Sequence, residues 1–122
     1  MSDQESINRK YQKELNAGIA SLVLLSVLDL AVEPLYGYQI SKMVGAGKEN
    51  GISMKQSALY PVLRSLEGNG LLSSQVEPSV SGPPRRYYQV TPLGKTILVG
   101  WKNTWHSTKT YVNSILEGEY RD

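Results

Sequence analysis

Residues 71–91 constrain the fold more than any other part of the chain, because they carry its clearest strand signals. Two β-favouring segments, residues 71–76 and 85–91, flank a connection that contains Gly82, Pro83 and Pro84. Short segments of this kind separated by Gly and Pro predict a β-hairpin. The connection is longer than the usual hairpin loop of about two to five residues, which is typical of a functional loop.

Three helices are predicted before the hairpin. Apolar residues recur at three- and four-residue steps over residues 7–31 and 38–44, which is the period of an amphipathic helix. Pro61 lies inside the third segment, residues 56–67, and predicts a short and locally irregular helix, because proline cannot donate a backbone hydrogen bond. The apolar positions of this third helix are Leu59, Leu63 and Leu66.

A short strand and a last helix complete the expected order. Residues 52–54 are a candidate strand before the third helix. The pair Thr91-Pro92 suits the N-cap and first position of a helix that runs to about residue 117. The order helix, helix, short strand, helix, strand, strand, helix predicts a mainly α protein with a small β-hairpin, an α+β winged helix-turn-helix. Residues 1–92 would form the winged-helix part and residues 93–122 a C-terminal helix, within one compact domain of 122 residues.

Composition argues against an enzyme and against a cofactor or metal. The chain has no Cys, and His106 is its only His. These counts exclude disulfides, thiolate zinc sites, a cysteine nucleophile and a two-His metal site. There is also no glycine-rich phosphate loop and no GxSxG motif. The longest apolar run, residues 19–32, is too short to cross a bilayer, and no secretory signal is visible at the start, so we expect a cytoplasmic protein.

Positive charge is concentrated in two places, although 13 basic and 11 acidic residues leave a net charge of only +2. Residues 55–64 contain two basic residues and no acid, and residues 78–95 contain three basic residues and no acid. In a helix-turn-helix protein the second helix of the motif enters the major groove of DNA. Here that helix is residues 56–67. The side chains expected to face the groove lie in or beside it and off its leucine face, and they are Lys55, Gln56, Ser57, Tyr60 and Arg64.

The loop tip of the hairpin is the second candidate for DNA contact. Arg85 and Arg86 follow Gly82, Pro83 and Pro84, and such a tip can lie along a phosphate backbone or reach a minor groove. Strand alternation points the two arginines to opposite faces. Two readings therefore stay open: both arginines contact DNA, or one contacts DNA while the other pairs with an acid.

The chain resembles the PadR family of transcriptional regulators over about residues 17–116. Four ordered motifs carry the resemblance: Tyr36-Gly37-Tyr38-Gln39-Ile40, Ala58-Leu59-Tyr60-Pro61-Val62-Leu63-Arg64-Ser65-Leu66-Glu67, Gly70-Leu71-Leu72, and the run Gly82-Pro83-Pro84-Arg85-Arg86-Tyr87-Tyr88-Gln89-Val90-Thr91-Pro92-Leu93-Gly94. The resemblance implies a dimeric winged-helix repressor that releases DNA on binding a small molecule. It also implies that Tyr38, Tyr60 and Arg64 lie near DNA and that residues 82–86 form the wing. Two positions depart from the family pattern: Pro83 replaces a usual Arg or Lys, and Lys55 replaces a usual Ser or Asn.

The last helix carries a candidate dimer interface. A mainly apolar row of side chains, with Thr108 between Trp105 and Val112, is spaced by alternating steps of three and four residues, the pattern of an a/d helical seam. The members proposed for a homodimer interface are Leu98, Trp101, Trp105, Val112 and Ile115. Trp101 and Trp105 are also candidates for binding a small aromatic effector, although tryptophans on such a seam are more often interface core.

The sequence therefore predicts a sequence-specific, double-stranded DNA-binding regulator. We expect a ligand-responsive repressor that acts as a homodimer on an inverted-repeat operator. The alternative is a winged-helix module that binds other proteins and has no role on DNA, because fold alone does not set function.

Overall fold

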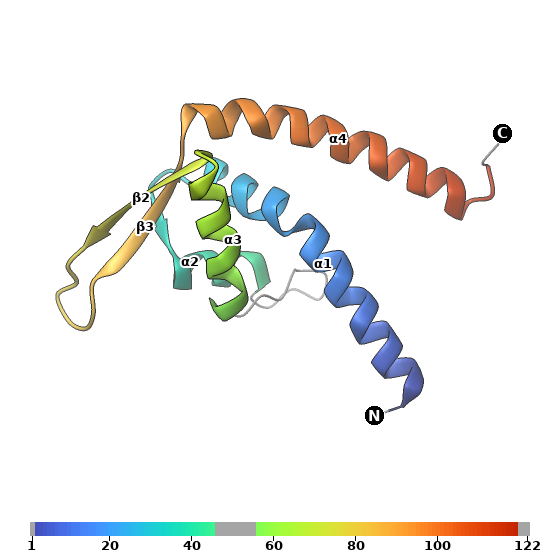
Figure 1. The fold of residues 1–122 in the computed structure, drawn as a ribbon, viewed down its shortest axis with the longest axis horizontal. Coiled ribbons are helices and arrows are strands. Elements are labelled where there is room, and N and C mark those ends of the chain that lie inside the picture. The colour runs from blue at the N-terminus through green and yellow to red at the C-terminus, as the bar shows by residue number, and fades with distance from the viewer. Residues whose placement is uncertain (1, 46–55, 120–122) are drawn as a thin grey trace.

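The computed structural model describes residues 2–45 and 56–119 (Figure 1). Its elements are α1 (Asp3–Leu30), β1 (Leu35–Tyr36), α2 (Gly37–Gly45), α3 (Gln56–Gly68), β2 (Leu72–Glu77), β3 (Arg85–Val90) and α4 (Pro92–Leu116). The mainly helical architecture with one small antiparallel sheet confirms the predicted fold class. The strand candidate at residues 52–54 and the groove candidate Lys55 lie outside the described residues.

The three-stranded sheet has the order β1-β3-β2. The hairpin of β2 and β3 was predicted within one residue at each end, and its register pairs Ser74 with Tyr88 and Val76 with Arg86. The sequence did not indicate β1, which has two residues and pairs Tyr36 with Tyr87. A strand of two residues is too short to show the alternation of apolar and polar side chains that predicts a strand. It forms because it pairs with the edge of β3.

The helices follow the predicted segments, with two differences. α1 starts earlier than expected, because the Ser2 hydroxyl accepts a hydrogen bond from the Glu5 amide at 3.1 Å and caps the helix. α3 is a continuous helix of 13 residues rather than a short irregular one. Pro61 lies near its N-terminal end, so the missing donor affects only the carbonyl of exposed Ser57, which water can reach.

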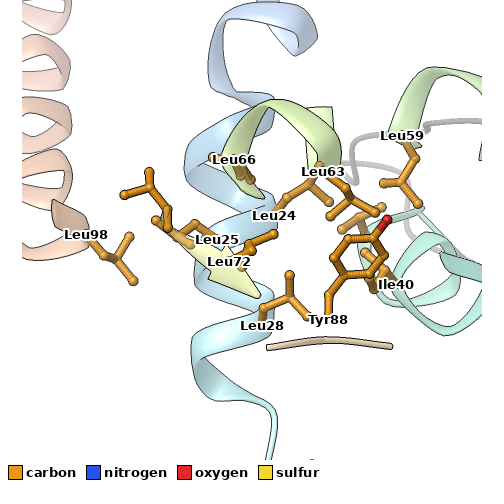
Figure 2. Close-up of a cluster of buried hydrophobic side chains, with 12 residues drawn as sticks. Leu24, Leu25, Leu28, Ile40, Leu59, Leu63, Leu66, Leu72, Tyr88 and Leu98 are labelled. Atoms are coloured by element: carbon orange, nitrogen blue, oxygen red, sulfur yellow. The ribbon is translucent and has the colours of Figure 1, made fainter. Parts of the chain in front are cut away.

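The core lies where α1, α2, α3, the sheet and the start of α4 meet (Figure 2). Leu59, Leu63 and Leu66 are all buried, as the periodicity of α3 predicted. Tyr88 of β3 lies beneath α3, and Leu98 is the buried apolar side chain that α4 adds. The other members of the cluster are Leu24, Leu25, Leu28, Ile40, Val44, Leu71 and Leu72.

The junction of β2, β3 and α4 is closely packed around Thr91 and Gly94. The Thr91 hydroxyl accepts from the Gly94 amide at 3.0 Å and donates to the Gly70 carbonyl at 2.6 Å. The Thr91 amide donates to the Leu71 carbonyl at 3.1 Å. A Cβ atom on Gly94 would overlap this same Leu71 carbonyl oxygen, so the approach of α4 to the residue that precedes β2 requires glycine at this position.

α1 and α4 meet near the core and diverge toward their outer ends (Figure 1). The N-terminal half of α1 exposes Ile7, Tyr11 and Leu15. The C-terminal half of α4 exposes Val112 and Ile115. Both outer ends therefore present apolar side chains that this chain alone does not cover. No helix among the described residues is long and apolar enough to span a membrane.

Candidate nucleic-acid interface

The exposed side of α3 carries three of the predicted groove-facing residues. Gln56, Ser57 and Arg64 are all exposed. They lie off the face that buries Leu59 and Leu63 in the core. Gln56 and Ser57 occupy the first turn of the helix, where amide and hydroxyl groups can reach base edges.

Tyr60 differs from its predicted position on the exposed face. Its side chain is half-buried, packs against the core, and lies directly on Gly37 at the start of α2. A Cβ atom on Gly37 would overlap the Tyr60 hydroxyl and ring. Tyr60 thus joins α3 to α2, which explains in physical terms why the chain has Gly37 between Tyr36 and Tyr38. Tyr60 is therefore less exposed than Arg64, its neighbour one turn later in α3.

Tyr38 lies in the first turn of α2 and is 50% exposed. The Nζ atom of Lys42, one turn later, lies 5.3 Å from the centre of the Tyr38 ring. This cation–π contact holds an aromatic ring beside a positive charge on the surface of α2. The pair can present both a phenol hydroxyl and an ammonium group to an anion.

The loop at the tip of the hairpin is held by its own hydrogen bonds. The Ser79 hydroxyl lies 2.9 Å from the Ser81 carbonyl oxygen and 3.0 Å from that of Gly82, and shares its one proton between these two acceptors. Gly82 has a φ of 99°, a conformation that other residues rarely adopt. Pro83 is exposed beside it. Proline and these bonds limit the freedom of the tip, so that less entropy would be lost when it docks on a partner.

Arg85 and Arg86 point to opposite faces of the hairpin, as strand alternation predicted. Arg85 stacks on Tyr36, with its Cζ atom 4.5 Å from the ring centre, and Tyr36 makes an edge contact with Tyr87. Arg86 lies on the same face as Tyr88, two residues along β3, and Tyr88 is buried beneath α3. Arg86 is therefore the wing arginine on the side of the recognition helix.

Arg86 is engaged by two side chains that the sequence did not single out. Its Nη1 atom donates to the Ser74 hydroxyl at 2.9 Å, and that hydroxyl donates to Oε2 of Glu67 at 2.6 Å. The contact joins three elements: β3, β2 and the end of α3. The alternation of side chains along β2 is compatible with Ser74 on the inner face of the hairpin. The sequence could not predict which residue of β3 lies beside it, because the register of a hairpin with a long loop cannot be read from sequence.

The charges of Arg86 and Glu67 also act on the phenol of Tyr88. Burial raises the pKa of Tyr88 above its ordinary value of 10.0. The positive charges of Arg86 and Arg64 oppose this effect and lower the pKa, whereas Glu67 and Tyr60 raise it. The positive charges of Arg64 from α3 and Arg86 from β3 therefore both act on the Tyr88 phenol.

Lys95 does not belong to the same positive surface. Its Nζ atom forms an ion pair with Asp29 at 2.8 Å, which joins the start of α4 to the end of α1. The three positive charges of residues 78–95 are thus divided in space. The wing keeps Arg85 and Arg86, and Lys95 pairs with an acid on the body of the protein.

The proposed dimer seam on α4 needs one correction. Leu98 is 2% exposed and belongs to the core of its own chain, because the first turns of α4 lie over α1 and β3. Trp101 is half-buried and packs against the same core. Trp105, Val112 and Ile115 keep 38%, 44% and 43% of their surface exposed. The apolar surface available to a partner therefore starts near Trp105.

A cavity of about 380 Å³ lies between α1 and α4. Trp101 and Trp105 line it from α4, and the other lining residues are Gly18, Ile19, Ser21, Leu22, Thr104 and Thr108. Its volume falls within the range of about 300–1,000 Å³ that is usual for small-molecule sites. Within residues 2–45 and 56–119, no group of three or more acidic or His side chains could hold a metal ion.

The arrangement defines a class of protein. Helices packed on a small sheet, with a hairpin projecting beside the third helix, form a winged helix-turn-helix (Figure 1). The profile described as "Transcriptional regulator PadR-like family" matches residues 24–99. The chain belongs to this family and is a winged-helix, DNA-binding transcriptional regulator.

Known proteins agree with this assignment. The structure is similar to that of a PadR family transcriptional regulator from Eggerthella lenta, with a TM-score of 0.80 and 33% identity over 93% of this chain and 96% of that one. A PadR-like transcriptional regulator from Bacillus cereus has a TM-score of 0.68 and 26% identity, over 84% of this chain and 96% of that one. An uncharacterised protein from Lysinibacillus sphaericus is 29% identical over 98 residues, which are 80% of this chain and 87% of that protein. The family and these two structures are transcriptional regulators rather than enzymes.

Proposed function

We propose that the protein binds an inverted-repeat operator as a homodimer, with α3 in the major groove and the wing on the flanking backbone. The observation that carries this proposal is the presence of one exposed arginine on each of the two elements, Arg64 on α3 and Arg86 on the face of the hairpin that lies toward α3. A helix surface and a hairpin that share one basic side can contact a groove and an adjacent phosphate together.

A homodimer formed through α4 and the outer half of α1 would match the two-fold symmetry of such an operator. Both helix ends expose apolar side chains that a second copy would cover. A two-fold dimer places two recognition helices about one helical turn of DNA apart. Because a bound dimer would block access to a promoter that overlaps its operator, we infer that the protein represses transcription.

The salt dependence of DNA binding tests this function. The wild-type protein would first select its duplex from a random pool, and binding to the enriched duplex would then be measured over a range of salt concentrations. We expect Arg64→Ala and Arg86→Ala each to weaken binding and to reduce the salt slope by about one. Arg9→Ala is the matched control, because Arg9 is an exposed arginine of α1 on the side of the helix opposite Ile7 and Tyr11, away from the apolar surface assigned to the dimer. It should leave the slope unchanged.

The alternative function is a protein-binding winged helix without a role on DNA. The two functions differ in what the selection would recover. Enrichment of one motif with salt-dependent affinity supports the regulator. Recovery of no motif would favour the protein-binding module. Enrichment of a motif with salt slopes that Arg64→Ala and Arg86→Ala leave unaltered would show that the interface is misassigned.

We further infer that a flat aromatic molecule is the effector that releases DNA. The cavity between α1 and α4 supports this, because two indole side chains and several apolar residues line it. Trp101 and Trp105 are the only tryptophans of the chain, so their fluorescence reports directly on the cavity. Titration with planar aromatic compounds should quench it, and Trp105→Phe should weaken the response. A broad panel without any quenching would contradict the effector proposal while leaving the DNA proposal intact.

A further inference from the structure

Arg86 on the wing is tied back to the recognition helix through Ser74. The guanidinium Nη1 atom lies 2.9 Å from the Ser74 hydroxyl oxygen, which in turn lies 2.6 Å from Oε2 of Glu67. The direction of these bonds is determined by chemistry. A serine hydroxyl has a single proton to donate, and because Glu67 takes it, the free lone pairs of Ser74 face Arg86.

The position of Glu67 supports a specific role for this contact. Glu67 lies in the last turn of α3, which contains no basic residue. A carboxylate at the C-terminal end of a helix is disfavoured by the helix dipole. β2 supplies a hydrogen-bond partner for this acid. The Ser74 hydroxyl donates a short hydrogen bond to the half-buried carboxylate of Glu67. The acid thereby sets the direction of the Ser74 hydroxyl.

The contact leaves Arg86 able to bind an anion. A guanidinium group has five N–H donors, and the bond to Ser74 uses one of them. The Arg86 side chain remains exposed, on the α3 side of the hairpin. An arginine held in one geometry loses less conformational entropy on binding than one that is free to move.

We propose that Ser74, with Glu67 behind it, is a positioning residue that holds Arg86 in the geometry for contact with one DNA phosphate. This inference rests on the proposed function, because it assigns Arg86 to the DNA backbone. Ser74 itself touches no nucleotide in this arrangement. It acts through Arg86, and its effect on affinity should vanish when Arg86 is absent.

A double-mutant cycle on the enriched duplex tests this role. Ser74→Ala removes the hydroxyl, and the loss of one oriented hydrogen bond should weaken DNA binding about fivefold. The salt slope should stay at its wild-type value, since no charge is lost. Ser74→Thr keeps the hydroxyl and should bind within about twofold of wild type. Ser73→Ala is the matched control, because Ser73 is the neighbouring serine of β2 and strand alternation directs its side chain to the opposite face.

The backgrounds of the cycle decide between positioning and simple stability. In an Arg86→Ala background, Ser74→Ala should cause no further loss of affinity. In an Arg85→Ala background, its fivefold effect should persist, because Arg85 stacks on Tyr36 at the other face. Thermal melts of every variant check that each is folded at the assay temperature.

The results that overturn the inference are distinct from those that overturn the function. If wild-type protein binds the duplex but Ser74→Ala behaves like Ser73→Ala, Ser74 does not position Arg86. The same conclusion holds if the Ser74→Ala effect persists in the Arg86→Ala background. If wild-type protein binds no duplex in a salt-dependent manner, the proposed DNA function itself fails.

Discussion

Gly94→Ala tests whether α4 approaches Leu71, just before β2, and Val90 of β3 as closely as the structure shows. The added Cβ atom would overlap the backbone carbonyl oxygen of Leu71 and lie 2.8 Å from Cγ1 of Val90. The carbonyl cannot easily move, because it accepts the Thr91 amide that positions the N-cap of α4. Relief therefore requires α4 to shift away from the hairpin.

The expected magnitude follows from two opposing effects. Overpacking of a tight site costs about 1–3 kcal/mol, and an obstruction by backbone belongs at the upper end of that range. Alanine in place of a helical glycine returns at most about 1 kcal/mol. We expect a net loss of about 2 kcal/mol in the free energy of unfolding, which corresponds to a fall of several degrees in Tm.

Gly100→Ala is the matched control for this prediction. Gly100 also lies in α4, is exposed, and has no atom within 4 Å of the position that a Cβ would take. It should stabilise the protein by about 0.5–1 kcal/mol through helix propensity and reduced freedom of the unfolded chain. Urea denaturation followed by circular dichroism, at one fixed protein concentration, measures both variants. If Gly94→Ala is as stable as Gly100→Ala, the close approach of Gly94 to Leu71 is wrong.

Three further predictions concern α2, the pH dependence of stability and the dimer. Gly37→Ala should destabilise the fold by about 1–3 kcal/mol through overlap with Tyr60, and Tyr60→Leu in the same chain should recover part of this loss in urea denaturation. Because burial raises the pKa of Tyr88, the folded chain keeps this proton at a pH where the unfolded chain releases it. The contribution of this proton to the free energy of unfolding is complete below the ordinary pKa of 10.0 and is lost as the pH rises through the raised pKa of the folded chain. Tyr88→Phe should therefore show a smaller loss of stability at alkaline pH than the wild-type protein in urea denaturation. Val112→Glu should shift the protein toward monomer in sedimentation analysis, and an unchanged dimer would exclude this part of α4 from the interface.

The positions of the helices and the hairpin were predictable because local patterns encode them. The leucines of α3 appear at helical spacing, and all three are buried. The Thr91-Pro92 pair begins α4, where the Thr91 hydroxyl caps the helix as expected. Each of these features depends on residues within a few positions of one another, so that the sequence contains all the information that they need.

The assignment of residues to the interface was only partly predictable. Periodicity placed Leu98 on the apolar face of α4, but it cannot tell whether that face meets the same chain or a second copy. The core of the chain covers Leu98 and leaves Val112 exposed. Tyr60 was expected on the surface, and it instead packs on Gly37, which is far from it in sequence.

The sequence by itself determined the positions of the helices and the β-hairpin, the winged-helix class and the family, and its lack of Cys and its single His removed most catalytic chemistry from consideration. Only the tertiary structure decided that Arg86 faces α3 and that Ser74 and Glu67 hold it. The physical reason is the range of the interactions. Helix periods, caps and turns act between near neighbours in the chain, whereas the register of a long hairpin and the packing of a helix against it depend on the whole core.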